Sequence, residues 1–289
     1  NNGVVIGTTT QTINNQVLAT DLTIGGFTYK GAGGADEYFN GKIANVKLYN
    51  RGFTSSEVLQ NYQAEQYRFE TPAGPVTNGL LLYWDAGNLD SYPGTGTTIY
   101  DLSGNGNNGT LNNGVGYNQT NGGVLVFDGV DDYMATPSTS AVAFGTGDFT
   151  IEFWLYLNSM SGLQVFYDSR PASAEGAQPT IYTNSSGTLF YYTTGNRITG
   201  SSLSTNTWYH IAVTRDHSSG AWKTFIGGVQ DTGASGAESS AVDTSLWNFE
   251  IGRDLVATDR YWNGYIQDFR ITKGLARYTA ADETSNIPS

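Results

Sequence analysis

The stretch Phe149–Leu157, FTIEFWLYL, decides the fold class of this chain. Every second residue from Phe149 to Leu157 is large and apolar, and successive side chains of an extended strand point to opposite faces. Strict alternation over nine residues therefore predicts a β-strand with one buried face. Such a strand needs a second layer to pack against, so the stretch indicates a sheet within a larger core.

The segments around this strand predict more strands and no alternating helices. Leu80–Trp84 and Val124–Phe127 are short apolar runs. Trp208–Thr214 and Trp222–Ile226 follow as two predicted neighbouring strands, with a turn at Asp216–Gly220 between them. Turn residues recur between these runs, which is typical of a β-sandwich. A parallel α/β fold is disfavoured, because no helical runs separate the strands.

Composition excludes several classes of function. Hydrophobic residues make up 38% of the 289 residues and aromatic residues 13%, which is enough for a large core. The net charge of −12 disfavours nucleic acid and anionic membranes as partners, because both would be repelled. The chain has no cysteine and therefore no disulfide. No run approaches the roughly 18 apolar residues of a membrane-spanning helix.

The chain contains an internal repeat. The hexapeptide YFNGKI at Tyr38–Ile43 matches YWNGYI at Tyr261–Ile266. An Ile-Gly pair and, before it, a Gly-Val step precede both copies in the same order: Ile24-Gly25 with Gly3-Val4, and Ile251-Gly252 with Gly228-Val229. Residues 1–53 thus correspond only to the last strands of a unit that spans about 79–280. A few strands cannot bury their inner face alone. We expect them to pack against something outside this sequence or to extend the second sheet.

A helix and a linker separate the two copies. Thr54–Glu57 (TSSE) fits a capping box, and apolar residues at helical spacing then predict a helix over about 55–68. Glu70–Asn78 holds two prolines and a glycine and reads as a linker. The predicted organisation is residues 1–69 as the C-terminal part of a truncated sandwich with its helix, 70–78 as linker, and 79–289 as a complete sandwich.

Four motifs in order carry a family resemblance: Asp101–Leu111 (DLSGNGNNGTL), Phe127–Tyr133 (FDGVDDY), Trp208–Val213 (WYHIAV) and Trp262–Ile271 (WNGYIQDFRI). Over about 79–280 the chain resembles the laminin-G-like, concanavalin-A-like lectin/glucanase superfamily. The resemblance implies an all-β fold, a jelly-roll-type antiparallel β-sandwich. Thr272–Thr279 (TKGLARYT) is further similar to laminin-G-like modules of tailed-phage virion proteins.

The resemblance implies a non-catalytic structural or adhesion protein on the surface of a bacteriophage virion, as a fibre, tail or head component. Expected partners are other virion proteins, or an upstream segment that completes residues 1–69, and the protein would be oligomeric in the particle. The alternative is a carbohydrate-binding lectin module that recognises host glycans. A glycoside hydrolase is the third hypothesis. Hydrolysis requires two carboxylic acids across a sugar, and Glu152 has no partner on its strand, so we expect no enzyme.

Two loops combine the oxygen ligands that calcium prefers. Asp101, Asn105 and Asn107 lie in one loop, where the family resemblance supports Ca²⁺. Asp128 and Asp131 lie in the acidic cluster at 128–132, a second candidate calcium site, although the resemblance implies a structural role for that segment. The competing interpretation is structural. Asp and Asn make side-chain turns and tolerate left-handed backbone, and acidic hairpin tips are usually solvated.

Four aromatic residues are candidates for binding a glycan or a protein partner: Tyr167, Tyr191, Tyr192 and Trp222. Exposed Tyr and Trp rings stack on sugars and anchor interfaces. The competing interpretation is that alternate rings fill the core, because strands send every second side chain inward. The sequence does not decide which of Tyr191 and Tyr192 faces inward.

Overall fold

A computed structural model describes the protein in two units, residues 1–73 and 74–289. The division falls inside the predicted linker, and each unit is considered by itself. The structure describes residues 24, 26–27, 37–41, 43, 46–63, 77–119, 122–136, 143–170, 179–193, 196–231, 249–257, 259–279, 284 and 287.

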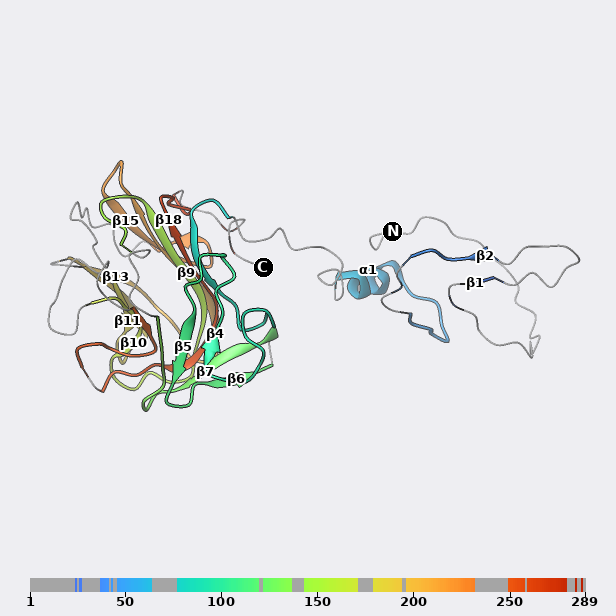
Figure 1. Ribbon diagram of the computed structural model, residues 1–289, viewed down its shortest axis with the longest axis horizontal. Coiled ribbons are helices and arrows are strands. Elements are labelled where there is room, and N and C mark those ends of the chain that lie inside the picture. Colours follow the sequence, from blue (N-terminus) through green and yellow to red (C-terminus); the bar gives the residue numbers. More distant parts are fainter. Residues whose placement is uncertain are drawn as a thin grey trace, which may run out of the picture. The chain divides into compact units, whose positions relative to one another are not determined.

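The second unit is a sandwich of two antiparallel sheets (Figure 1), which confirms the predicted fold class. The first sheet has the order β13 (Asn196–Ser202), β12 (Thr188–Thr193), β11 (Thr180–Thr183), β10 (Gln164–Asp168), β17 (Glu250–Ile251), β8 (Tyr133–Ala135), β5 (Gly109–Asn112), β4 (Thr98–Ile99). The second has the order β16 (Val229–Gln230), β15 (Ala221–Ile226), β14 (Trp208–Asp216), β9 (Phe149–Leu157), β18 (Asn263–Lys273), β7 (Val124–Asp128), β6 (Gly116–Asn118), and β3 (Leu80–Trp84) also pairs with β18.

Strand β9 is the centre of the second sheet, between β14 and β18. Its five alternating apolar side chains, predicted to share one face, are each at most 1% exposed: Phe149, Ile151, Phe153, Leu155 and Leu157. They lie in one core cluster with residues of the opposite sheet, such as Phe166 and Ile251. Each fully buried side chain of this size stabilises the fold by about 1.5–3 kcal/mol, so the face of β9 is a main source of stability.

Strand β18 carries a local irregularity at Asp268. The register with β9 shifts between Gln267 and Arg270, and Asp268 adopts φ 56°, a left-handed conformation that Asp tolerates better than most residues. Asp268 is 7% exposed, and its carboxylate lies 2.8 Å from Arg270 Nη2. Burial outweighs the attraction of Arg270 and raises the pKa of Asp268 to about 6, and the charges of Asp85 and Glu152 act in the same direction.

This raised pKa predicts a pH dependence of stability. The ordinary value is 3.8 and the folded value about 6, so ionisation is disfavoured in the folded state. The favourable contribution of protonated Asp268 is present below pH 4 and is lost as the pH rises through 6. In Asp268→Asn, which keeps the shape and the backbone preference, this loss disappears. Between pH 4 and pH 7, the free energy of unfolding of the variant should therefore increase relative to that of the wild type by up to about 3 kcal/mol. Urea denaturation at each pH measures this difference. Parallel pH curves for the two proteins would contradict the expectation.

The first unit contains β1 (Gly26–Phe27), β2 (Glu37–Tyr38) and α1 (Ser55–Gln63), with β1 antiparallel to β2. The predicted capping box is confirmed. Glu57 N–H donates to Thr54 Oγ1 at 3.3 Å, and Thr54 N–H donates to Glu57 Oε2 at 2.9 Å. Hydrogen bonds from Arg51 and then from Thr54 lower the pKa of Glu57 to about 2. Residues 64–68, included in the predicted helix, lie outside the described residues.

Within the described residues, no helix combines the length and the apolar character needed to cross a membrane.

Candidate functional site

Three of the four aromatic candidates lie in the core, so that part of the sequence prediction is wrong. Tyr167 is 0% exposed, and Tyr191 and Trp222 are each 1% exposed. The rings of Tyr191 and Trp222 are 5.0 Å apart across the sandwich interior. No ligand reaches side chains buried in this way. Tyr192, the next residue of β12, points to the opposite face and is half-buried.

Tyr192 lines a cleft of about 190 Å³ on the outer face of the first sheet. Tyr182 of the neighbouring strand β11 lies in the same cleft and stacks on Phe190, with ring centroids 5.1 Å apart. The remaining lining residues come from the position just before β10, from β10 itself, from the segments after β10 and β17, and from the start of β11: Leu163, Val165, Arg170, Thr180, Asp254 and Arg260. The cleft thus combines two tyrosines with a charged wall.

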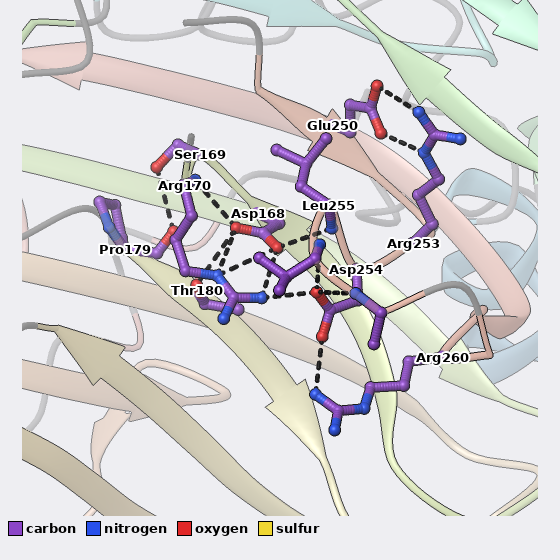
Figure 2. A network of polar contacts seen from close by, with 12 residues as sticks. Asp168, Ser169, Arg170, Pro179, Thr180, Glu250, Arg253, Asp254, Leu255 and Arg260 are labelled. Atoms are coloured by element: carbon purple, nitrogen blue, oxygen red, sulfur yellow. Dashed lines mark hydrogen bonds and ion pairs between the residues drawn. The ribbon is translucent and has the colours of Figure 1, made fainter. Parts of the chain in front are cut away.

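Arg170 organises the charged wall (Figure 2). Its guanidinium donates to both carboxylate oxygens of Asp168, at 3.0 Å from Nε to Oδ1 and 2.7 Å from Nη2 to Oδ2. Nη2 also donates to Asp254 Oδ1 at 2.7 Å. The side chains of Asp168 and Asp254 are 0% and 1% exposed. One buried cation therefore joins the end of β10 to the segment after β17.

Asp254 holds that segment and a second arginine. It accepts hydrogen bonds from the N–H groups of Val256 and Ala257 at 2.8 and 3.1 Å, and from Arg260 Nη1 at 2.9 Å. Burial by itself would raise the pKa of Asp254, but the hydrogen bond from Val256 and the charge of Arg170 outweigh it and hold the pKa below its usual value. Asp254 is thus an ionised acceptor. The side chain of Arg260 is 41% exposed and remains accessible from the cleft.

These contacts define what the cleft can bind. Two arginines and two aspartates balance each other's charge, so the wall offers directed hydrogen bonds with little net charge. Pockets that bind drug-sized ligands have volumes of about 300–1,000 Å³. The volume of this cleft lies below that range and suits a single ring-sized group. Tyrosine rings beside fixed polar groups provide a stacking surface and orientation together.

Glu152, the lone acid of β9, faces away from the core and is nevertheless fully buried. Arg277 Nη1 and Tyr278 Oη donate to its two oxygens at 2.7 and 2.6 Å, and His210 Nε2 lies 3.4 Å away. The segment after β18 therefore covers this part of the sheet. Glu152 cannot reach a sugar at the surface.

The family profile described as concanavalin A-like lectin/glucanases superfamily matches residues 128–276, about half of the chain. The chain belongs to this superfamily. The matched residues 128–276 include the central strands β9, β14 and β18 and all the charged residues of the cleft. The coarser part of the predicted resemblance is thus confirmed.

Solved structures of several superfamily-like sandwiches share the fold at low sequence identity. Domain 4 of AbnA, an extracellular arabinanase from Geobacillus stearothermophilus, matches with a TM-score of 0.52 and 19% identity over 72% of this chain and 97% of that domain. The binding domain of botulinum neurotoxin serotype D gives 0.51 and 15% over 73% of this chain and 50% of that one. Trypanosoma rangeli sialidase gives 0.53 and 12% over 72% and 32%. At these identities the likeness shows the fold alone. No curated protein sequence matches the chain.

The acidic tip of this superfamily sandwich brings three carboxylates together. Asp128, Asp131 and Asp132 each place one oxygen within 4.8 Å of the others, which is close enough to hold a metal ion. Asp128 and Asp131 are the predicted ligands, and Asp132, the last residue of the same acidic cluster in the sequence, joins them. Asp132 is 3% exposed and accepts a hydrogen bond from Asp128 N–H at 3.0 Å. Burial raises the pKa of Asp132. Calcium at this tip stays a prediction.

The other predicted calcium loop has a structural role. Asp101 accepts hydrogen bonds from Tyr83 N–H, Ser103 N–H, Ser103 Oγ and Asn107 N–H at 2.7–3.0 Å. The side-chain amides of Asn105 and Asn107 donate to the carbonyl of Leu81 at 3.1 and 2.9 Å. These contacts tie the loop to β3, as the structural interpretation proposed, and calcium in this loop stays a prediction.

Sequence reasoning missed most of the cleft. Arg170, Asp254 and Arg260 carry no motif, and 84 residues separate Arg170 from Asp254. A local signal was the triplet Asp168-Ser169-Arg170 directly after an apolar run, since charged residues at a strand end commonly face a loop or a ligand. Nothing in the sequence indicated that Asp254 would meet it.

Proposed function

We propose that the protein is a non-catalytic adhesion module that binds a surface glycan in the cleft of Tyr182, Tyr192, Arg170 and Arg260, and that it acts as a surface component of a phage virion. The observation that carries the glycan part is the pairing of two half-buried tyrosines with an arginine–aspartate wall in one ring-sized cleft. Aromatic rings and fixed hydrogen-bond donors are the features that recognise a sugar's apolar face and its hydroxyls.

Relatives support this ligand class. The AbnA domain was solved in complex with arabinotriose. Another structure of similar fold concerns the cell entry of botulinum neurotoxin type C, which depends on two ganglioside molecules. These ligands belong to those proteins. For this chain they support a carbohydrate as the class of ligand and do not select one sugar.

The chemistry of the cleft supports a non-catalytic role. Glycoside hydrolysis needs a carboxylic acid with a raised pKa beside a second carboxylate. The pKa of Asp254 is lowered, and hydrogen bonds engage both of its oxygens. Asp168 is likewise held by Arg170 and by Leu255 N–H. The cleft therefore offers no proton donor of the required kind among the described residues.

The virion assignment rests on the similarity of Thr272–Thr279, after the last strand, to laminin-G-like modules of tailed-phage virion proteins. Electron microscopy with gold-labelled antibody against this chain tests it. Label on the head surface, tail or fibres of an intact particle supports the assignment, and label only on lysed host material contradicts it.

Substitutions in the cleft test the glycan part. Tyr192→Ala and Arg260→Ala should each weaken binding of a glycan-array hit by roughly tenfold, because each removes about 1–1.5 kcal/mol of stacking or charged hydrogen bonding. Isothermal titration calorimetry measures the change. Tyr100→Ala, at a tyrosine that is 47% exposed outside the cleft, should bind like wild type. A glycan whose affinity is the same for all three variants and wild type does not bind in this cleft.

A further inference from the structure

The guanidinium of Arg260 is only partly engaged by the protein. Its Nη1 donates to Asp254 Oδ2 at 2.9 Å, and its Nε lies 3.9 Å from Asp259 Oδ1, too far for a hydrogen bond. Within the part of the chain that the structure describes, its Nη2 makes no hydrogen bond to another residue. A guanidinium carries five N–H donors. The edge formed by Nε and Nη2 is therefore available to a ligand, and Arg260 lines the cleft.

Arg170 shows how the same edge is filled by a carboxylate. Its Nε and Nη2 donate to the two carboxylate oxygens of Asp168, at 3.0 Å and 2.7 Å. Arg170 and Arg260 also share Asp254, the first at Oδ1 and the second at Oδ2 (Figure 2). Among the described residues, however, only Arg170 donates to a second carboxylate. The Nε–Nη2 edge of Arg260 thus lacks the partner that its neighbour holds.

Exposure decides which charge a ligand in the cleft meets. The side chains of Asp168 and Asp254 are at most 1% exposed. That of Arg170 is 8% exposed, whereas that of Arg260 is 41% exposed. Because the interaction between charges weakens with distance, an anion in contact with Arg260 is attracted more strongly than the buried aspartates repel it. Asp259 is 85% exposed and forms only a loose surface pair with Arg260, which a ligand can displace.

The geometry and the number of these donors favour a single carboxylate on the ligand. The planar fork of an arginine matches the two oxygens of a carboxylate, and such bidentate pairs are strong and directional. The cleft, of about 190 Å³, has room for one ring. The net charge of −12 repels ligands that carry many negative charges. A sugar with one carboxylate therefore fits better than a polysulfated glycan, which would bring several charges to one accessible arginine.

We propose that the glycan bound in this cleft is acidic, and that the carboxylate of one uronic or sialic acid residue pairs with the Nε–Nη2 edge of Arg260. The ring of that sugar residue packs against Tyr192 of the same cleft. This assignment rests on the proposed function, that the cleft binds a glycan, and adds the class of sugar and the residue that selects it. A neutral sugar leaves the open edge of Arg260 to water, so Arg260 determines specificity.

Paired ligands that differ only in the state of the carboxyl group test the assignment. The full chain is applied to an array of carboxylated glycans, their carboxyl methyl esters, neutral glycans and sulfated glycans. Isothermal titration calorimetry then compares the carboxylated glycan that binds most tightly with its methyl ester. The acid should bind at least roughly tenfold more tightly, because the ester keeps the ring but loses the charge and the pair of equivalent oxygens.

Three variants of the full chain separate the fork, the charge and the stacking surface. In Arg260→Gln the acid and its ester should bind equally. In Arg260→Lys, which keeps the charge without the fork, the preference for the acid should fall to roughly threefold. In Tyr192→Ala both ligands should bind less tightly by the same factor, so the preference for the acid stays as in wild type. Thermal unfolding checks that each variant is folded.

The outcomes distinguish this assignment from the proposed function on which it rests. If esters or neutral glycans bind as tightly as acids, or if sulfated glycans bind more tightly, the assignment is wrong while glycan binding stands. A preference for acids that persists in Arg260→Gln also overturns it, because the carboxylate is then bound by another residue. If no glycan on the array binds, the glycan function of the cleft fails together with the assignment.

Discussion

Arg170→Ala should lower the free energy of unfolding of the sandwich by about 3–5 kcal/mol, because it removes one partner of a buried charge cluster and leaves the others buried. Asp168 would lose its guanidinium and Asp254 one of its two arginines. Both carboxylates are at most 1% exposed in the folded protein, so they depend on these guanidinium donors for their hydrogen bonds. The segment after β17 would lose its tie to β10, and with it one wall of the cleft.

Arg260→Ala is the matched control for this effect. Arg260 donates to the same carboxylate, Asp254, but its own side chain is 41% exposed. Exposed ion pairs contribute about 0–1 kcal/mol, so this variant should unfold close to wild type while binding its glycan less tightly. Urea denaturation at pH 7 measures both variants. Equal losses of stability in the two variants would show that the burial of Arg170 does not determine how much its ion pairs contribute to the free energy of unfolding.

Local patterns of the sequence were sufficient for much of the fold. The alternation in β9 and the capping box at Thr54 depend on residues close in the chain, and both formed as predicted. Period-two alternation fixes which residues share a face, but only neighbouring strands fix which face is inward. This is why Tyr191 and Tyr192 could be separated only by the structure.

An irregularity in β10 misled the prediction for Tyr167. The register with β11 shifts between Val165 and Tyr167, so Phe166 and Tyr167 both enter the core. A bulge of this kind re-aims side chains and leaves no clear signature in one sequence. The cleft was hidden for a different reason, since its charges meet only after strands far apart in sequence have paired. Contacts between residues so far apart in the chain depend on how the strands pair, and no local sequence pattern predicts them.

The C-terminal segment depends on another such contact, and Glu152→Ala should release it. Arg277 and Tyr278 both donate to Glu152, and the side chain of Arg277 is only 7% exposed. Without the carboxylate, a guanidinium and a hydroxyl remain buried without this acceptor, and we expect a loss of about 3–5 kcal/mol in the free energy of unfolding. Trypsin should then cleave at Arg277 in the native protein. Tyr278→Phe removes one hydrogen bond and should cost only about 1–3 kcal/mol.

The pH dependence of this loss distinguishes a charged contact from simple packing. Burial opposes ionisation of Glu152, but its contacts with His210, Arg277 and Tyr278 outweigh burial and lower its pKa below the ordinary 4.5. A lowered folded pKa means that the stabilisation is present above pH 4.5 and is lost as the pH falls through the folded value. The gap in stability between wild type and Glu152→Gln, which keeps the volume of the side chain, should therefore be widest near pH 7 and shrink below pH 4.5. A gap that stays constant from pH 7 to pH 3 would mean that Glu152 holds the segment by shape alone.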